Sequence, residues 1–555
     1  MTWCFDCKRS QNGDQLALCK DLGHDIDYEH LFTPTNYDMI DQTKPKENSK
    51  HDSPVKKMAK IATSEMVKVI ASQSDGTRVF AVVKMNSHFE TIELEKKNSK
   101  TIHWLMVTAS EKLDEMYSED TCASAIGFLK AKALMNEKIQ SEEIHLRLAR
   151  VGNEIYYELG RTDWKLIRVR KDGITFVDYS SSTPVFVRTS RTGRQTDPNL
   201  MPDGDPLDKF AKLCRIPNSE LFKVHLVSMF IPGVPIPIMA IHGHAGAAKS
   251  TVSSMVKMVV DPAGKRHEDN LKSFPHGEDN FVTSLSSSYF SGYENISHIN
   301  TEISNMLCRA VTGGSFEKRA QYTNGDVYSI SIMRKILING IDFTISQSDL
   351  ADRSIIYDLE RILDENRKTA KSIEESFKRL LPDLLGQIFL ILQKVLQTVE
   401  KTEQQTEKPP RMADFAIIGE AIYQAMGNNP GEFLKLYKDS IQKNLEVLYE
   451  NNPIIPCLYN VLDGKKEVKF QANELYKRIK IFVENEGFNS KRIPQGSNGI
   501  GNWFTRSKTL LDENKIIVTK YKNTLSKPVS GFTSGAIIYN IQHIESIQIK
   551  LKESE

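Results

Sequence analysis

The sequence predicts an α/β fold that is divided among several domains. Its 555 residues are too many for a single hydrophobic core and suggest roughly three or four domains. Strand-like runs alternate with helix-like runs along most of the chain. Near the middle, "PIPIMAIHGHAGAAKSTVSSMVKMVV" (235–260) joins an apolar strand, a glycine-bearing turn and an amphipathic helix. Together these three observations indicate the α/β class.

The composition is that of an ordinary globular protein. Hydrophobic residues make up 40% of the chain and charged residues 26%, with a net charge of +2. This balance argues neither for nor against nucleic acid, so any basic surface must be local. The start, "MTWCFDCKRS", has no apolar signal core, and no uninterrupted apolar run approaches a bilayer's thickness. The seven cysteines do not form a disulfide framework. We therefore expect a cytoplasmic protein without a membrane partner.

Residues 1–31 are predicted to form a small zinc-binding module. The ligands would be Cys4, Cys7, Cys19 and either His24 or His30. Three thiolates and an imidazole suit tetrahedral structural Zn²⁺, and so short a segment cannot fold on an apolar core alone. The alternative is a set of free cysteines in a frayed N-terminus.

Two regions without predicted chemistry follow. Residues 32–60 are polar and lack apolar periodicity, which predicts a flexible linker. Residues 61–204 mix strands such as "RVFAVVKM" and "EIYYELG" with helices such as "ASAIGFLKAKALMNEK". They are predicted to form an α+β domain.

The turn in the opening segment is predicted to bind phosphate. Ile236–Ile241 would be a buried strand, and the helix after the turn has an apolar stripe that faces a sheet. Backbone amides of the turn and of the helix N-terminus would point at the anion. Lys249 would reach the β- and γ-phosphates of ATP, and the Ser250 hydroxyl would bind Mg²⁺. The predicted binding residues are Gly243, Gly246, Ala248, Lys249, Ser250 and Thr251.

Ala248 departs from the usual motif, GxxxxGK[ST], because it stands where a second glycine is expected. Alanine fits there only if its φ is negative or if some strain is accepted. Gly246, two residues earlier, is an alternative carrier of the unusual backbone conformation.

Hydrolysis also needs a carboxylate near Mg²⁺ and water, a polar group that senses the γ-phosphate, and an arginine. Downstream of the turn, Glu294, Asn339 and Arg353 occur in that order. Each has a plainer interpretation. Glu294 is otherwise a surface carboxylate after a poor strand, Asn339 is a turn residue, and Arg353 is paired with Asp349 or Asp352.

The motifs around these residues resemble a known family. "YENIS", "LCRAVTGGSFEKRAQYTNGDVYS", "RKILINGI", "DLADRSIIYDL" and "RMADFA" resemble the ATPase of phage and mobile-element primase-helicases, which is similar to superfamily 3 helicases and AAA+-like proteins. The resemblance covers about residues 65–535, without a primase domain. It implies a P-loop NTPase core at 205–362 and a helical region at 363–458.

The resemblance also implies roles for the site residues. Lys249 and Ser250 would hold the phosphates and Mg²⁺, and Glu294 would polarise water or bind the metal. Asn339 would be the sensor. Arg353 would stabilise the transition state on a neighbouring subunit, which implies an oligomeric ring.

Two basic segments are predicted to contact DNA. A hairpin within "SFEKRAQYTNGDVYSISI" carries Lys318, Arg319 and Tyr322, which suit strand tracking by charge and stacking. Residues 459–555 are predicted to form a winged-helix-like domain with Lys491, Arg492, Arg506 and Lys508. The alternatives are a structural hairpin and an ordinary lysine-rich surface.

The sequence therefore predicts an ATP- and Mg²⁺-dependent, helicase-like DNA translocase that replicates a mobile or viral element. An ATP-switched DNA-binding initiator that does not separate strands is the alternative. A small-molecule kinase is a third class, which the downstream motifs disfavour.

Overall fold

The computed structural model describes residues 52–544 except 86, 265–266, 298, 320–326, 341–346, 363–364, 366, 406–408, 452, 487, 489–492 and 525–529. Before this range it describes only the backbone of β1 (Thr2–Cys4), β2 (Arg9–Gln11) and β3 (Ile26–Asp27), an antiparallel sheet. Cys7, Cys19, His24, His30 and the side chain of Cys4 lie outside the described residues. The zinc module therefore stays a prediction.

An N-terminal α+β unit has its own core. Its sheet has the order β6-β5-β4-β7, and three helices bury their apolar faces in the same core as that sheet. The elements are α2 (Pro54–Glu65), β4 (Met66–Ser72), β5 (Val79–Met85), β6 (His88–Glu93), α3 (Ser99–Leu113), α4 (Glu119–Leu134) and β7 (Gln140–Glu142).

The predicted linker, residues 32–60, is wrong in its last part because α2 begins at Pro54. Ser53 caps this helix by accepting a hydrogen bond from the Lys56 amide, and proline suits the first helical position. Met58 is fully buried. Residues 32–51 lie outside the described range.

A four-stranded antiparallel sheet comes next and joins a different core. It has the order β12-β11-β10-β9, formed by β9 (Leu148–Val151), β10 (Glu154–Glu158), β11 (Leu166–Arg170) and β12 (Gly173–Val177). Beside it, β8 (Ile144–His145) pairs in parallel with β13 (Val185–Phe186). Tyr157 and Ile167 belong to the core of the central sheet. The region predicted as one domain, 61–204, thus contributes to several separate cores.

The central sheet is parallel and confirms the α/β class. Its order is β15-β16-β19-β14-β20, formed by β15 (Lys272–Ser273), β16 (Phe290–Glu294), β19 (Lys335–Gly340), β14 (Ile238–Gly243) and β20 (Ser354–Leu359). Alternate residues of β14 face two cores: Met239 and Ile241 face one, Ile238 and Ala240 the other. A sheet covered on both faces is typical of parallel strands.

Helices cover both faces of the central sheet. On one face lie α7 (Lys249–Val260), α5 (Pro206–Cys214) and α6 (Ser219–Ser228). On the other lie α8 (Glu278–Ser286) and α9 (Thr301–Thr312). Next to α9 the predicted hairpin is present as β17 (Ser315–Arg319) and β18 (Val327–Ser331). The connection between the two strands, residues 320–326, lies outside the described residues.

The predicted helical region contains α11 (Ala370–Gln405), α12 (Ala413–Ala425) and α13 (Glu432–Asn451). Within the described residues, α11 is the one helix long and apolar enough to cross a membrane, which the sequence analysis missed. Leu384, Ile388 and Leu392 of α11 are fully buried in the core it shares with α5, α7 and α12. That burial is typical of a core helix.

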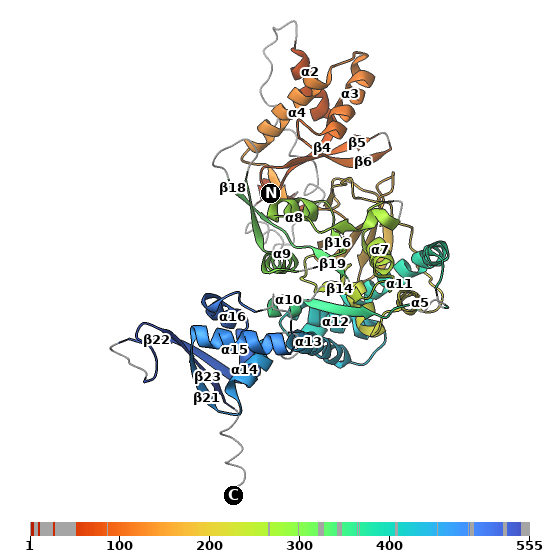
Figure 1. The fold of residues 1–555 in the computed structure, drawn as a ribbon. Coiled ribbons are helices and arrows are strands. Elements are labelled where there is room, and N and C mark those ends of the chain that lie inside the picture. Colours follow the sequence, from red (N-terminus) through yellow and green to blue (C-terminus); the bar gives the residue numbers. More distant parts are fainter. Residues whose placement is uncertain are drawn as a thin grey trace.

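The chain ends in a helix-rich unit with a three-stranded antiparallel sheet, β21-β23-β22. Its elements are α14 (Ile454–Leu462), β21 (Glu467–Gln471), α15 (Ala472–Asn485), α16 (Ile500–Arg506), α17 (Lys508–Glu513), β22 (Ile516–Lys522) and β23 (Ile537–His543). Figure 1 shows this blue unit and the orange N-terminal unit at opposite ends, with the central sheet between them.

Candidate functional site

The turn between β14 and α7 has the backbone geometry of a tight loop. Gly243 has a φ of +148°, and a Cβ there would lie 2.4 Å from the carbonyl oxygen of Leu359 on β20. Only glycine therefore fits at the end of β14. Gly246 also has a positive φ, +83°. The turn lies at the carboxyl edge of the sheet, where β14 separates β19 from β20, the kind of place where open α/β sheets bind ligands.

Ala248 adopts the strained alternative that the sequence left open. Its φ of 62° and ψ of 27° place it in the left-handed region, directly before the first residue of α7. That conformation costs a non-glycine residue about 1–2 kcal/mol. Such strain persists only where the surroundings enforce it, and it is common at ligand-binding loops.

The first turn of α7 is open to an anion. No side chain caps it at Ala248, and it contains no acidic residue. The positive end of the helix dipole is therefore not offset by a carboxylate in the first turn. The Lys249 ammonium folds back over the turn and donates to the carbonyl oxygens of Gly243 (2.6 Å) and His244 (2.9 Å). An exposed Ser250 follows. Positive charge, the N-terminal amides of a helix and a hydroxyl thus meet at one place.

Glu294 and Asn339 lie side by side at the same edge of the sheet. Glu294 ends β16, and the register pairs Tyr293 with Ile338 and Ile241 with Asn339. Glu294 is therefore level with Asn339, and β19 alone separates it from β14. At a strand spacing of about 4.8 Å, the backbones of β16 and β14 lie about 10 Å apart. Beyond the carboxyl end of β19, that distance leaves room for phosphate and metal between Glu294 and the loop.

Asn339 ties α7 to the turn after Glu294. Its side chain is buried and donates from Nδ2 to the Ser253 hydroxyl (2.9 Å). Its Oδ1 accepts from the Asn295 amide (3.1 Å), and its backbone oxygen accepts from the Ile296 amide (3.0 Å). Asn295 itself has a positive φ, 56°. Asn339 is thus positioned at the site, while its sensor role stays a prediction.

Arg353 lies at the opposite edge of the sheet. It precedes β20, and its carbonyl oxygen accepts from the Ile238 amide at the start of β14. Its guanidinium pairs with the Asp349 carboxylate, as the plainer interpretation proposed. Burial raises the pKa of Asp349, but hydrogen bonds from Arg353 and Cys308 hold it below its ordinary value. Arg353 is therefore far from its own chain's loop, and its action on a neighbour stays a prediction.

The sequence analysis missed an arginine beside the loop. A Cβ placed on Gly246 would lie 3.5 Å from Nη2 of Arg367, a residue of the segment between β20 and α11. On the strand next to the loop, His242 Nδ1 contacts Asp358 Oδ1 of β20 (2.6 Å). That hydrogen bond lowers the pKa of Asp358. The position of Arg367 in the chain was the one signal that could have revealed it. Arg367 follows a parallel strand, and such a segment begins at the same edge of the sheet as the loop.

The residues predicted to bind DNA are only partly described. Lys318 and Arg319 lie in β17 and Arg506 ends α16, but their side chains lie outside the described residues, as do Tyr322, Lys491 and Arg492 altogether. Lys508 is exposed at the start of α17. On the neighbouring hairpin, Lys520 and Lys522 of β22 are also exposed.

The oxygen ligands at the loop fit Mg²⁺. This ion takes one or two protein oxygens and completes its shell with phosphate and water. Ser250 and Glu294 supply a hydroxyl and a carboxylate of that kind. Among the described residues, no group of three or more His, Cys, Asp or Glu side chains is placed to hold a metal. An all-protein metal cage is therefore not found in that part of the chain.

Comparison with known proteins gives one family match. Residues 207–444 match the family model of the actinomycete integrative conjugative element replication protein. This chain thus resembles a replication protein of a mobile element. The matched residues span less than half of the chain. No curated protein matches it.

Several solved structures match this chain at low similarity. One is described as "SCCmec type IV Cch - active helicase", with 12% identity, coverage of 86% of this chain and 92% of that one, and a TM-score of 0.40. Another is the apo A form of the NrS-1 C-terminal region, with 12% identity, coverage of 89% and 100%, and a TM-score of 0.35.

The replication-protein match includes the complete candidate site. It contains the loop, Glu294, Asn339, Arg353 and Arg367, and it ends within α13. It excludes the N-terminal unit, the four-stranded sheet and the C-terminal unit. The resemblance thus covers the central sheet, the helices packed on it, the β17–β18 hairpin and the helices from α11 into α13.

Proposed function

We propose that this protein is an ATP- and Mg²⁺-dependent DNA translocase of helicase type that acts in the replication of a mobile element. The observation that carries the proposal is the loop between β14 and α7. It combines a strained Ala248, an uncapped helix N-terminus and a folded-back Lys249, with Glu294 and Asn339 on the adjacent strands. The match to a mobile-element replication protein supports the setting.

Each group has a task in attack by water on the γ-phosphorus. Amides of the turn and Lys249 would hold the phosphates, and Ser250 and Glu294 would hold Mg²⁺, which when bound would offset the charge of the phosphate oxygens. Glu294 or Asn339 orients the attacking water. Arg367 of the same chain lies next to Gly246 and suits stabilisation of the transition state. Arg353 must leave Asp349 before it can serve a neighbour's nucleotide in a ring.

The other parts of the chain complete the proposal. Exposed lysines of the C-terminal unit contact the DNA backbone, in a winged-helix-like arrangement of α15, α16, α17 and the β22–β23 hairpin. Cys4, Cys7, Cys19 and His24 or His30 hold a structural Zn²⁺. The β17–β18 hairpin tracks a DNA strand.

The test is the rate of ATP hydrolysis with and without single-stranded DNA. Lys249→Ala is expected to abolish turnover because the phosphates lose their cationic partner. The matched control is Lys212→Ala, since Lys212 is exposed on α5 and paired only with Asp208. DNA-stimulated hydrolysis by Lys249→Ala at the rate of the control would refute the assignment of the loop.

Strand displacement on a forked duplex separates the two DNA functions. A translocase of helicase type separates the strands while it hydrolyses ATP. A DNA-binding initiator is the alternative, and a role in replication fits it equally well. It would bind DNA and hydrolyse ATP without separating the strands.

A further inference from the structure

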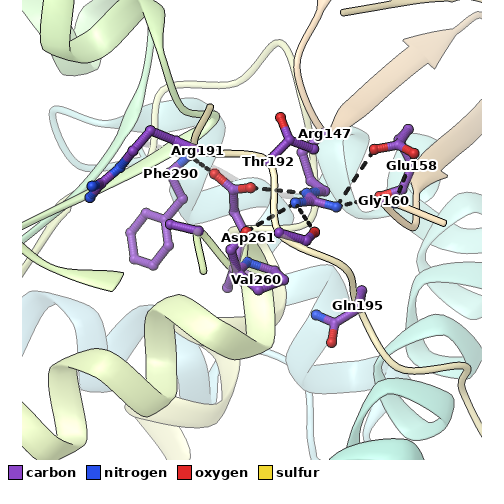
Figure 2. Close-up of polar contacts among 12 residues, drawn as sticks. Arg147, Glu158, Gly160, Arg191, Thr192, Gln195, Val260, Asp261 and Phe290 are labelled. Carbon is purple, nitrogen blue, oxygen red and sulfur yellow. Dashed lines mark hydrogen bonds and ion pairs between the residues drawn. The ribbon is translucent and has the colours of Figure 1, made fainter. Parts of the chain in front are cut away.

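The buried end of α7 lies in a cluster of charges that links four segments. Asp261, the residue after the helix, is nearly inaccessible to solvent, and Arg147, between β8 and β9, is fully buried. Arg147 Nε donates to Asp261 Oδ1 (2.9 Å), and the Phe290 amide at the start of β16 donates to Asp261 Oδ2 (3.1 Å). Figure 2 shows Asp261 between these two partners.

All three nitrogens of the Arg147 guanidinium donate hydrogen bonds. Nη1 donates to the Glu158 carbonyl oxygen (2.8 Å), and Nη2 donates to the carbonyl oxygens of Gly193 (2.8 Å) and Pro262 (3.1 Å). The chain at Gly193 approaches so closely that a Cβ there would lie 2.7 Å from the Pro262 oxygen. One side chain therefore fixes β10, the loop after β13 and the end of α7 (Figure 2).

The same neighbours cap the C-terminal end of α7. Gln195 Nε2 donates to the carbonyl oxygens of Met258 and Val259 (both 3.0 Å), and the Tyr157 hydroxyl donates to that of Val260 (3.1 Å). These oxygens have no partner within the helix. The positive charge of Arg147 also lies at the negative end of the helix dipole. All of these groups come from the region before the central domain.

Stability alone is a weak explanation for a buried charge cluster in this place. Burying ions costs several kcal/mol each, and apolar side chains of similar size are often equally stable. Asp261 stays charged there. Burial raises its pKa, but the charges of Lys257 and Arg147 hold that pKa below its ordinary value. What the cluster provides is a fixed relation between α7, β16 and the four-stranded sheet.

That relation controls the site at the other end. α7 begins with Lys249 and Ser250, and β16 ends with Glu294. Asp261 holds both elements at their far ends. A small rotation of either one would therefore move the phosphate-binding groups relative to Glu294. Displacements of about 1 Å cost as much as roughly 100-fold in rate.

We propose that Arg147 and Gln195 are positioning residues for nucleotide hydrolysis, and that the segment from β8 to Gln195 is a fixed part of the catalytic body. This inference rests on the proposed ATPase function. It assigns a role to a region in which the sequence shows no chemistry of its own.

The test uses the full chain with Arg147→Met. In this variant Asp261 keeps the buried Lys257 ammonium (3.0 Å) and Glu158 keeps the Arg188 guanidinium (2.6 Å), so no buried charge is left without a partner. Asp261 also still accepts from the Phe290 amide. We expect a folded protein whose kcat falls at least about tenfold while the KM for ATP changes little, because binding groups remain and their alignment is lost. Arg147→Lys keeps the positive charge but has fewer hydrogen-bond donors than the planar guanidinium. Its kcat should therefore lie between those of Arg147→Met and the wild type.

Arg161→Met is the matched control, since Arg161 pairs with Asp163 and Asp197 and does not contact α7. Wild-type kcat in folded Arg147→Met would overturn the inference. Should that variant fail to fold, Gln195→Leu tests it in the same way, because the helix-capping contacts are lost while Arg147 and Asp261 stay paired. A wild-type protein without ATPase activity would instead refute the proposed function itself.

Discussion

At the residue scale, the site depends on a few backbone positions that side-chain chemistry alone does not predict. Ala248 is the clearest example. The sequence leaves two explanations for its departure from the motif, and the structure has the strained one, with a φ of 62°. Relief of this strain can be measured.

Ala248→Gly is expected to raise the free energy of unfolding by about 0.5–1 kcal/mol. Glycine adopts the left-handed conformation freely, which outweighs its greater entropy in the unfolded chain. The matched control is Ala247→Gly at the preceding residue. Ala247 is buried and lacks a positive φ, so this change should lower stability. Urea unfolding of both variants measures these free energies. A lower free energy of unfolding in Ala248→Gly than in the wild type would contradict the account.

Among single side chains, the sequence predicted that Lys249, Glu294 and Asn339 act on one nucleotide. The structure places Glu294, Asn339 and the loop with Lys249 at the same edge of the sheet, while their action on a nucleotide stays a prediction. The distance of Arg353 from the loop could not be predicted from sequence. Arg353 precedes β20, and that strand had first to be known to run parallel to β14 beside it. Arg367 was missed for the related reason that it follows a strand and lies in no motif. Both cases require the fold.

At the element scale, some glycines are required by a close approach of the chain rather than by a turn. The strand before Glu294 looked poor because it contains Ser291 and Gly292. The structure has a buried strand, since a Cβ at Gly292 would lie 2.7 Å from Leu271 Cδ2. Small residues there are a packing requirement, which a count of apolar residues does not detect.

Helix α11 provides a direct test of such packing. A Cβ on Gly386 would lie 1.6 Å from the Asn199 carbonyl oxygen of a segment that crosses the helix. Gly→Ala within a helix normally stabilises by about 1 kcal/mol. Here we expect Gly386→Ala to destabilise by about 1–3 kcal/mol because the backbone must move.

The control for Gly386→Ala is Gly127→Ala in α4. A Cβ there meets only the flexible Lys96 side chain, which can move aside. Thermal unfolding of the two variants should give shifts that differ in size, with the larger loss at Gly386. Equal shifts would show that the crossing segment is not held against α11.

At the scale of the whole molecule, the proposed DNA-binding surface lies in the C-terminal unit, away from the loop (Figure 1). Lys520 and Lys522 are exposed on β22. Each phosphate contact lowers the slope of log K against log salt by about 0.7–0.9. Lys520→Ala and Lys522→Ala should each make that slope shallower by about this amount, measured by fluorescence anisotropy with single-stranded DNA.

Lys480→Ala is the control for the salt series, because Glu484 already neutralises the charge of Lys480 on α15. Its slope should equal that of the wild type. Unchanged slopes in all three variants would place DNA binding on another surface.

The whole-molecule organisation was predictable only in outline. The α/β core, the helical region and the terminal hairpin follow from apolar periodicity. The division of residues 61–204 among several cores does not, because Tyr157 and Ile167 look the same in sequence whichever sheet they pack against. The contacts of Arg147 with Asp261, 114 positions later, are equally invisible in a local pattern.

The most direct test of the central claim is a structure of the full chain with a non-hydrolysable ATP analogue and Mg²⁺. The account predicts phosphates against the amides of residues 246–251, with the metal on Ser250 and with Arg367 and Asn339 close to the γ-phosphate. Nucleotide bound elsewhere, or phosphates out of reach of Lys249, would contradict it.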